Sequence, residues 1–151
     1  MNWAFEITVK NRNLLNHFLE NFSLDELNKV PDGFTNNIIW NIAHTIVTQQ
    51  LLVYKLSGLP MNVSDEMVAA YKKGSKTEKN VTQAEVDIIK NLLFSTLKKT
   101  EDDYNNKLFK TYNTYTVSTN STLTNVEEAI AFNNFHEGIH LGYILALKRA
   151  L

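Results

Sequence analysis

The chain has 151 residues, of which 44% are hydrophobic and 21% are charged, and its formal net charge is -1. This length and composition predict one globular domain, residues 1–151, with a sizeable core. A net charge this close to zero argues against nucleic acid or an anionic membrane surface as a partner. No apolar run approaches the roughly 18 residues that a membrane helix needs.

The chain contains no cysteine. A disulfide, a thiolate metal site and a cysteine nucleophile are therefore excluded. The first residues lack the basic and apolar segments of a secretory signal, so a cytoplasmic protein is expected.

Helical patterns dominate the first part of the chain. The first helix is predicted over Asn2–Phe22, and Ser23–Glu26 resembles a capping box for a short following turn. The second helix is predicted over Thr35–Ser57, and Gly58 with Pro60 supplies its stop. Each helix carries an apolar stripe, which in the first consists of Leu14, Leu15, Phe18, Leu19 and Phe22. The apolar residues of the second helix cover more than half of its circumference, so it is expected to be mostly buried.

Two longer connections are predicted in the second half. Residues 59–80 form a polar connection with a short helix over Asp65–Lys72, and its lysines are expected to form a solvated face. A third helix begins at the capping box Thr82–Glu85 and ends near Asn105. Residues 107–123 are predicted to form a long loop with a short extended piece, and loops of this length are often functional.

The last helix is predicted to begin at a third capping box, Thr124–Glu127, and to reach the C-terminus. The pattern as a whole predicts an all-α fold, an antiparallel four-helix bundle. Long connections are expected between its second and third helices and between its third and fourth.

His136 and His140 lie one turn apart on the last helix, so they project from the same side. A helical wheel places them on an apolar face with Ala129, Phe132, Ile139, Tyr143 and Leu147. A buried imidazole without a partner costs about 1–3 kcal/mol, and one metal ion would satisfy both rings. The alternative is a pair of core histidines that bind tyrosine hydroxyls or asparagines.

His44 on the second helix shares a face with Trp40 and Leu51, so it is predicted to point inward and to complete a three-histidine site. His17 lies away from the apolar stripe and is predicted to be a surface residue. Three neutral imidazoles suit zinc, nickel or iron. Three protein ligands leave coordination positions open, which is typical of a catalytic site, and the ion's charge favours an anionic fourth ligand.

Residues His136–His140 also fit the H-E-x-x-H pattern of zinc metalloproteases, in which Glu137 would be the general base. Such enzymes need a third ligand further along the chain. None of the residues after His140 is His, Asp or Glu, and strand patterns are weak. A peptidase is therefore not favoured.

The order and spacing of these segments resemble the DinB-like family, which includes the YfiT-like metal-dependent hydrolases. Asn37–His44 resembles the family's second-helix segment, and Phe135–Ile144 resembles its closing helix. The resemblance implies a four-helix bundle with a histidine triad at His44, His136 and His140. It also implies an enzyme that uses a low-molecular-weight thiol of the bacillithiol or mycothiol type, activated by the metal. Other relatives are isomerases or have no known activity.

Two functions stay open at this point. In the first, an S-transferase or related hydrolase uses the metal to activate an external thiol, or water, against a small-molecule substrate. Trp40, Tyr143 and the tyrosines of residues 107–123 would line the pocket, and Glu137 would be either a base or a surface residue. In the second, the bundle is non-catalytic and uses its metal for stability, ligand sensing or dimer formation. A homodimer is expected, because family members often dimerise.

Overall fold

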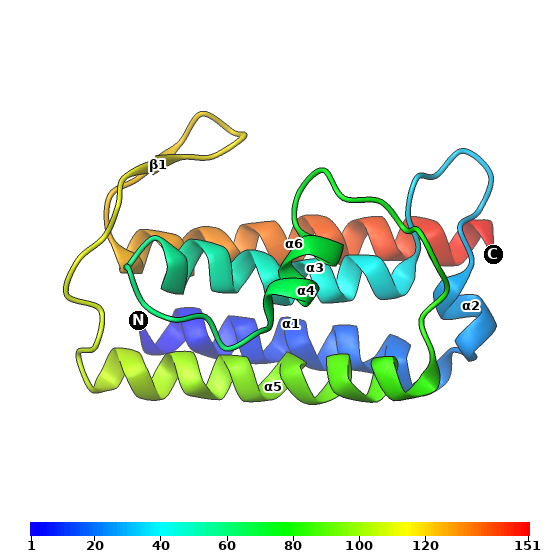
Figure 1. Ribbon diagram of the computed structural model, residues 1–151, viewed down its shortest axis with the longest axis horizontal. Coiled ribbons are helices and arrows are strands. Elements are labelled where there is room, and N and C mark those ends of the chain that lie inside the picture. The colour runs from blue at the N-terminus through cyan, green and yellow to red at the C-terminus, as the bar shows by residue number, and fades with distance from the viewer.

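A computed structural model describes all residues 1–151, and it is mostly helical (Figure 1). In chain order the elements are α1 (Asn2–Asn21), α2 (Leu24–Asn28), α3 (Ile38–Gln50), the π-helical turn η1 (Leu51–Lys55), α4 (Asp65–Tyr71), α5 (Gln83–Asn105), β1 (Tyr115–Thr116), β2 (Thr122–Leu123) and α6 (Val126–Ala150). The two short strands form an antiparallel hairpin. No helix combines the length and the apolarity that crossing a lipid bilayer requires.

The long helices α1, α3, α5 and α6 form a bundle in which α1 and α3 each pack against α5 and α6. The prediction of an all-α helical bundle with two long connections is confirmed. The helix directions do not simply alternate between neighbours. One end of the core contains Leu15, Ile38, Val86 and Leu147, and the other contains Phe5, Val53, Leu97 and Ala129. Helices α1 and α6 therefore run in one direction, and α3 and α5 run in the other.

Residues 56–82 explain this topology. At 1.5 Å per residue the long helices span about 27 to 38 Å. A connection of this length, with α4 folded against α3, carries the chain back along the bundle. Helix α5 therefore starts at the end of the bundle where α3 started, as the colours of Figure 1 show.

Side-chain caps fix most helix starts. The predicted capping boxes at Ser23 and Thr82 are both present. The third start is shifted by one residue, because Asn125 caps α6 and Glu128, rather than Glu127, accepts the hydrogen bond from the backbone of Thr124. Helix α3 begins at Ile38 instead of Thr35, because the side chain of Asn37 accepts a hydrogen bond from the Trp40 N–H at 2.9 Å.

Helix α6 is rotated relative to the predicted wheel. Its buried residues are Val126, Ala129, Ile130, Asn133, Glu137, Ile144 and Leu147, whereas Ile139 is 50% exposed. The buried face of α6 is therefore centred on Glu137, and the two histidines lie at the edge of that face, on the side towards α3. A smaller error of the same kind affects α1, where Leu14 is 52% exposed and the core stripe instead includes Arg12.

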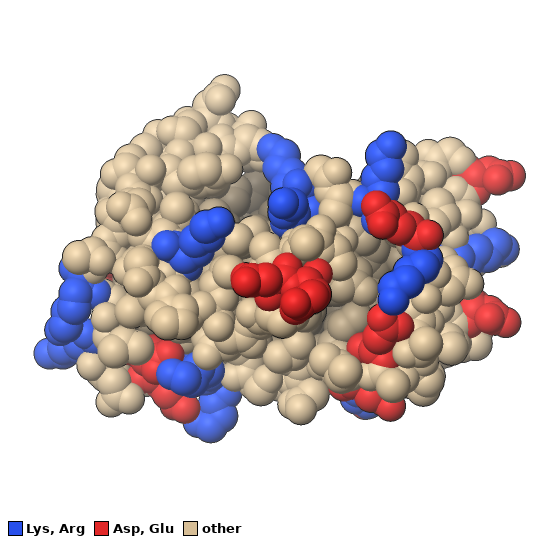
Figure 2. All heavy atoms as spheres, in the orientation of Figure 1, with Lys and Arg blue, Asp and Glu red and all other residues tan.

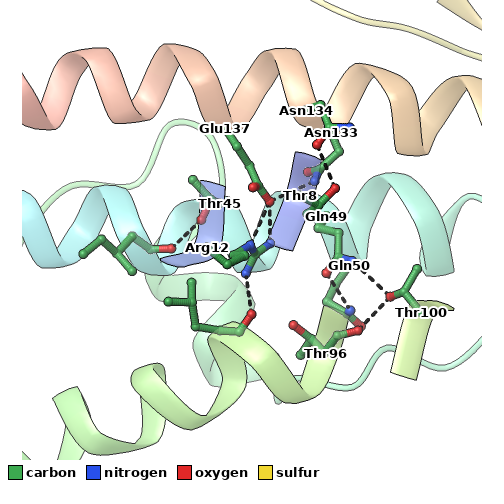
Figure 3. Close-up of polar contacts among 12 residues, drawn as sticks. Thr8, Arg12, Thr45, Gln49, Gln50, Thr96, Thr100, Asn133, Asn134 and Glu137 are labelled. Atoms are coloured by element: carbon green, nitrogen blue, oxygen red, sulfur yellow. Dashed lines mark hydrogen bonds and ion pairs between the residues drawn. The ribbon is translucent and has the colours of Figure 1, made fainter. Parts of the chain in front are cut away.

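A fully buried ion pair between Arg12 of α1 and Glu137 of α6 crosses the core (Figure 3). Glu137 Oε1 lies 2.6 Å from Arg12 Nη2, and it also accepts hydrogen bonds from Arg12 Nε and Asn133 Nδ2, each at 2.9 Å. Arg12 Nη1 donates to the carbonyl of Leu93 on α5 at 3.3 Å. A buried charge is tolerated only when it is paired, so this pair fixes α1, α5 and α6 relative to one another.

Replacing Glu137 with alanine leaves the Arg12 guanidinium buried without a counter-charge. We expect Glu137→Ala to lower the free energy of unfolding by about 3–5 kcal/mol, as measured by urea denaturation followed by circular dichroism. The double variant Arg12→Met/Glu137→Leu removes both charges and should recover much of this loss. A loss below about 1 kcal/mol in the single variant would show that the pair does not hold the bundle together.

Candidate metal centre

His44 of α3 and His136 and His140 of α6 converge at one place on the α3–α6 interface. Their nearest ring nitrogens all lie within 4.8 Å of one another. The Nε2 atoms of His136 and His140 are 3.1 Å apart. Two nitrogens bound to one tetrahedral ion at 2.0–2.1 Å would be about 3.3 Å apart, so this spacing fits a shared metal.

Oxygen acceptors orient two of the three rings. His44 Nδ1 lies 2.6 Å from the carbonyl oxygen of Tyr71, the last residue of α4. His140 Nδ1 lies 2.8 Å from Asn41 Oδ1. An Nδ1–H that donates to oxygen leaves the Nε2 lone pair free, which is how proteins orient metal-binding histidines.

The Asn41 side chain is itself fixed. Its Nδ2 donates to Asn36 Oδ1 and to the backbone carbonyl of Asn37, both at 2.8 Å. These two bonds settle which end of the amide is nitrogen, so Oδ1 must face His140. On the other side of the site, the Trp40 ring stacks on His44 with centroids 4.7 Å apart and an interplanar angle of 11°. The His44 ring is therefore fixed by a hydrogen bond and by stacking.

Burial keeps these imidazoles neutral. It lowers the pKa of His136 to about 3, with further contributions from the positive charges that His140, His44 and Arg12 would present. The pKa of His140 is lowered to about 4, mainly by burial and to a smaller extent by the positive charge that His44 would present. The pKa of His44 is also lowered by burial, against the opposing effect of the Tyr71 carbonyl. Neutral rings offer lone pairs at pH 7, as metal binding requires.

His136 also has an unsatisfied atom, because its Nδ1 is buried without a hydrogen-bond partner. Its Nε2 faces only the other rings. The donor set, three neutral nitrogens with no carboxylate or thiolate among them, fits a borderline divalent metal such as zinc, nickel or iron. No fourth His, Asp or Glu joins the group, so the site keeps the open coordination that a catalytic metal needs.

A cavity of about 350 Å³ adjoins the triad, with His44 and His136 in its wall. Thr48, η1 and Phe132 contribute to its wall, and the β1–β2 hairpin contributes through Tyr115 and residues 117–119. Figure 2 shows a hollow at this face of the molecule. The volume is that of a small-molecule site. The 107–123 connection thus contributes to the cavity through Tyr115, whereas the Tyr112 hydroxyl donates to the backbone carbonyl of Leu52.

Glu137 does not fit the general-base role expected of it. Its side chain is fully buried and its carboxylate binds Arg12 and Asn133 in the interior of the bundle. A general base must reach the proton it abstracts, and this carboxylate lies outside the wall of the cavity at the triad. Glu137 is also not the surface residue that the alternative expectation described.

Trp40 and Tyr143 do not line the cavity at the triad either. Trp40 lies behind His44, where its Nε1–H donates to Ser75 Oγ at 3.2 Å, and it borders a different cavity between α3 and α4. Tyr143 packs edge-on against Phe34 with ring centroids 5.5 Å apart. Their positions support structural roles, and in the case of Trp40 that role is to hold the ring of His44 by stacking. His17 is exposed, as predicted, and contacts Asn21.

The sequence patterns did not reveal the groups that orient the triad. Asn41 lies three residues before His44 on the same helix, so its position near the site could be predicted. Its hydrogen bond to His140 could not, because that bond depends on how α6 packs against α3. The Tyr71 carbonyl belongs to the backbone of a separate helix, so no side-chain pattern encodes it. Arg12 stands seven residues after Phe5 and three before Leu15, within the buried stripe of α1, and extending that stripe would have found it.

Two neighbouring antiparallel helices thus supply one histidine and an i, i+4 histidine pair to a three-nitrogen site beside a small cavity. The fold and the site together are those of a helical bundle with a histidine triad. The chain belongs to the DinB superfamily, whose family model matches residues 7–144 and therefore includes all three histidines. The resemblance inferred from the sequence is confirmed. No curated protein matches the chain.

The lowered histidine pKa values predict how the stability of the metal-free protein depends on pH. Because the pKa values of His136 and His140 in the folded protein lie below the ordinary 6.5, the unfolded chain takes up protons first as the pH falls. This part of the stability is present above about pH 6.5 and is lost progressively toward pH 4. Urea unfolding across this range should show the decline, and it should be much shallower in His136→Gln/His140→Gln. Equal slopes in the two proteins would contradict it.

Proposed function

We propose that this protein is a metal-dependent enzyme that transfers a low-molecular-weight thiol of the bacillithiol type to an electrophilic small molecule. The observation that carries the proposal is the convergence of three neutral imidazoles in the wall of a cavity of ligand size. A related hydrolase would use the same site with water as the nucleophile. Membership of the DinB superfamily is compatible with both reactions.

His44, His136 and His140 would hold a zinc, nickel or iron ion. When bound, the metal lowers the pKa of a coordinated thiol or water molecule. The Tyr71 carbonyl and the Asn41 amide keep two rings in the tautomer that binds a metal through Nε2. Because the chain contains no cysteine, the thiol must come from outside.

The composition of the cavity favours a thiol over water. No Asp or Glu lines it, so no carboxylate is present to take a proton from water. A thiol has an ordinary pKa of about 8.5 and needs only a modest decrease to become a thiolate at pH 7. The Thr48 hydroxyl, 3.3 Å from His44 Nε2, lies beside the site and is placed to orient a ligand. The leucines and Phe132 add apolar surface to the wall of the cavity.

The alternatives fit less well. A zinc peptidase needs the base that Glu137 does not supply. A metal that serves only stability would be expected to have a fourth protein ligand and no adjoining cavity, and neither description matches this site. A ligand sensor would share the site and the cavity, so the rate of thiol transfer is what distinguishes it from an enzyme.

The first test combines metal content with activity. We expect untagged protein to contain about one zinc, nickel or iron per chain by mass spectrometry. We expect His136→Ala/His140→Ala to lose the metal, and the surface variant His17→Ala to keep it. The metal-loaded protein should then accelerate conjugation of monochlorobimane with bacillithiol, cysteine or glutathione at least tenfold over the metal-free double variant.

Two results would count against the proposal. Wild-type protein that binds no metal even after reconstitution would remove the site. Metal binding without acceleration for any of the three thiols would leave a sensor or structural metal in its place.

We also propose that the protein forms a homodimer through the exposed face of α6. Between Glu128 and Lys148 the only charged residue of this helix is the buried Glu137, and Phe135 and Leu145 are half exposed. An uncharged apolar face of this length is self-complementary around a twofold axis. Gly138 and Gly142 have open space above them, which allows a second helix to approach closely.

Analytical ultracentrifugation tests the dimer directly. Gly142→Glu places a charge at the centre of the uncharged face, and we expect it to shift the protein from dimer to monomer without loss of helicity. Asn91→Glu on the exposed side of α5 is the matched control and should leave the dimer intact. Wild-type protein that sediments as a monomer would refute the proposal.

A further inference from the structure

The cavity beside the triad, here called the triad pocket, has an unusual charge. Two lysines contribute to its wall, Lys55 from the last residue of η1 and Lys73 from the turn that follows α4. No Asp or Glu contributes to it. The other three sizeable cavities of the molecule each contain at least one acidic residue, namely Glu66 and Glu78, Asp87, and Glu127. Of these four cavities, the triad pocket is therefore the only one whose wall contains lysines and no acidic residue.

The two lysines are also free of partners within the protein. The chain forms six ion pairs, and neither Lys55 nor Lys73 takes part in any of them. Lys79, Lys90, Lys98 and Lys99 each bind a carboxylate. Figure 2 shows Lys and Arg side chains (blue) beside the hollow at this face. Two exposed lysines without ion-pair partners, from different elements, contribute to the wall of one cavity, and their positive charges favour an anion there.

Most of the rest of the wall is apolar. Leu51, Leu52, Val117 and Phe132 are among the residues that line it, so a bound molecule would contact hydrocarbon over much of its surface. A metal held by three neutral imidazoles would add a further uncompensated positive charge at the triad. The wall of the pocket therefore combines two of the triad histidines, a group of apolar side chains and two lysines.

We propose that the triad pocket binds a small molecule with an apolar body and a carboxylate, and that Lys55 and Lys73 bind the carboxylate. This inference deepens the proposed function, because it assigns the chemical class of the substrate or thiol at the same site. The carboxylate is a group separate from the atom that binds the metal. Lys55 and Lys73 are specificity-determining residues in this scheme, and they take no part in proton transfer.

The test uses calorimetric titration with three probes. 4-Phenylbutyrate has an apolar body and a carboxylate, 4-phenylbutyramide has the same body without the charge, and acetate has the charge without the body. We expect 4-phenylbutyrate to bind the purified wild-type protein at least roughly tenfold more tightly than either of the others. Equal affinities for the carboxylate and the amide, or no measurable binding of 4-phenylbutyrate, would overturn the proposal.

Lysine variants identify the groups that bind the anion. Lys55→Gln and Lys73→Gln should each weaken 4-phenylbutyrate binding roughly threefold or more, and the double variant roughly tenfold or more. None of them should change the affinity for 4-phenylbutyramide. Lys72→Gln is the matched control, because Lys72 is an exposed neighbour of Lys73 outside the wall of the pocket, and it should behave as wild type.

The same titrations on chelator-treated protein separate this inference from the metal-dependent function. We expect the lysine-dependent preference for the carboxylate to persist without metal. A preference that disappears with the metal and ignores both lysines would mean that the carboxylate binds the metal itself. That result would overturn the lysine assignment while leaving the metal site supported. A lysine-dependent preference in a protein with no thiol-transfer activity would support the pocket assignment and refute the proposed reaction.

Discussion

The buried ion pair between Arg12 and Glu137 is the constraint on which the rest of the structure depends. Both side chains are fully buried, and the pair joins α1 to α6 while Arg12 also binds the backbone of α5. Because an unpaired charge in this position would be strongly destabilising, α6 cannot rotate about its axis without breaking the pair. The orientation that the pair imposes on α6 places His136 and His140, which lie one residue before and three residues after Glu137, on the side that faces α3. The position of the histidine triad thus follows from an electrostatic requirement in the core.

The triad illustrates how burial and hydrogen bonding act together. Burial lowers the pKa values of the three histidines and so keeps their lone pairs available at neutral pH. The Tyr71 carbonyl and the Asn41 amide then decide which nitrogen keeps the lone pair. The two acceptors come from α4 and α3, so the short helix in the long connection has a function beyond linking α3 to α5. Its last residue provides the carbonyl that orients His44.

Much of this arrangement was predictable from the sequence, because it depends on local patterns. The capping residues Ser23 and Thr82, the i, i+4 spacing of His136 and His140, and the apolarity around His44 are all properties of short segments. The orientation of α6 about its own axis was not predictable, because it depends on Arg12, which is far away in sequence and belongs to another helix. The wheel placed Ile139 in the core, whereas the helix buries Glu137 there to meet the guanidinium.

The remaining errors have the same cause. Trp40 and Tyr143 were assigned to a substrate pocket because they lie near the histidines in sequence, but the packing of Ser75 and Phe34 turns them elsewhere. Lys73 is exposed, as the predicted solvated face requires, but only the folded connection brings it beside the hairpin. The parallel direction of α3 and α5 likewise depends on the route of residues 56–82, which no helical pattern encodes.

The β1–β2 hairpin has a consequence for how this scaffold can change over evolutionary time. The three histidines and the groups that orient them come from α3, α4 and α6, whereas part of the pocket wall comes from the short β1–β2 hairpin in the connection to α6. Insertions or substitutions in that hairpin alter the shape of the pocket and leave the histidines untouched. A lineage can therefore change which small molecules fit the pocket by remodelling this hairpin, while the histidine triad is inherited unchanged.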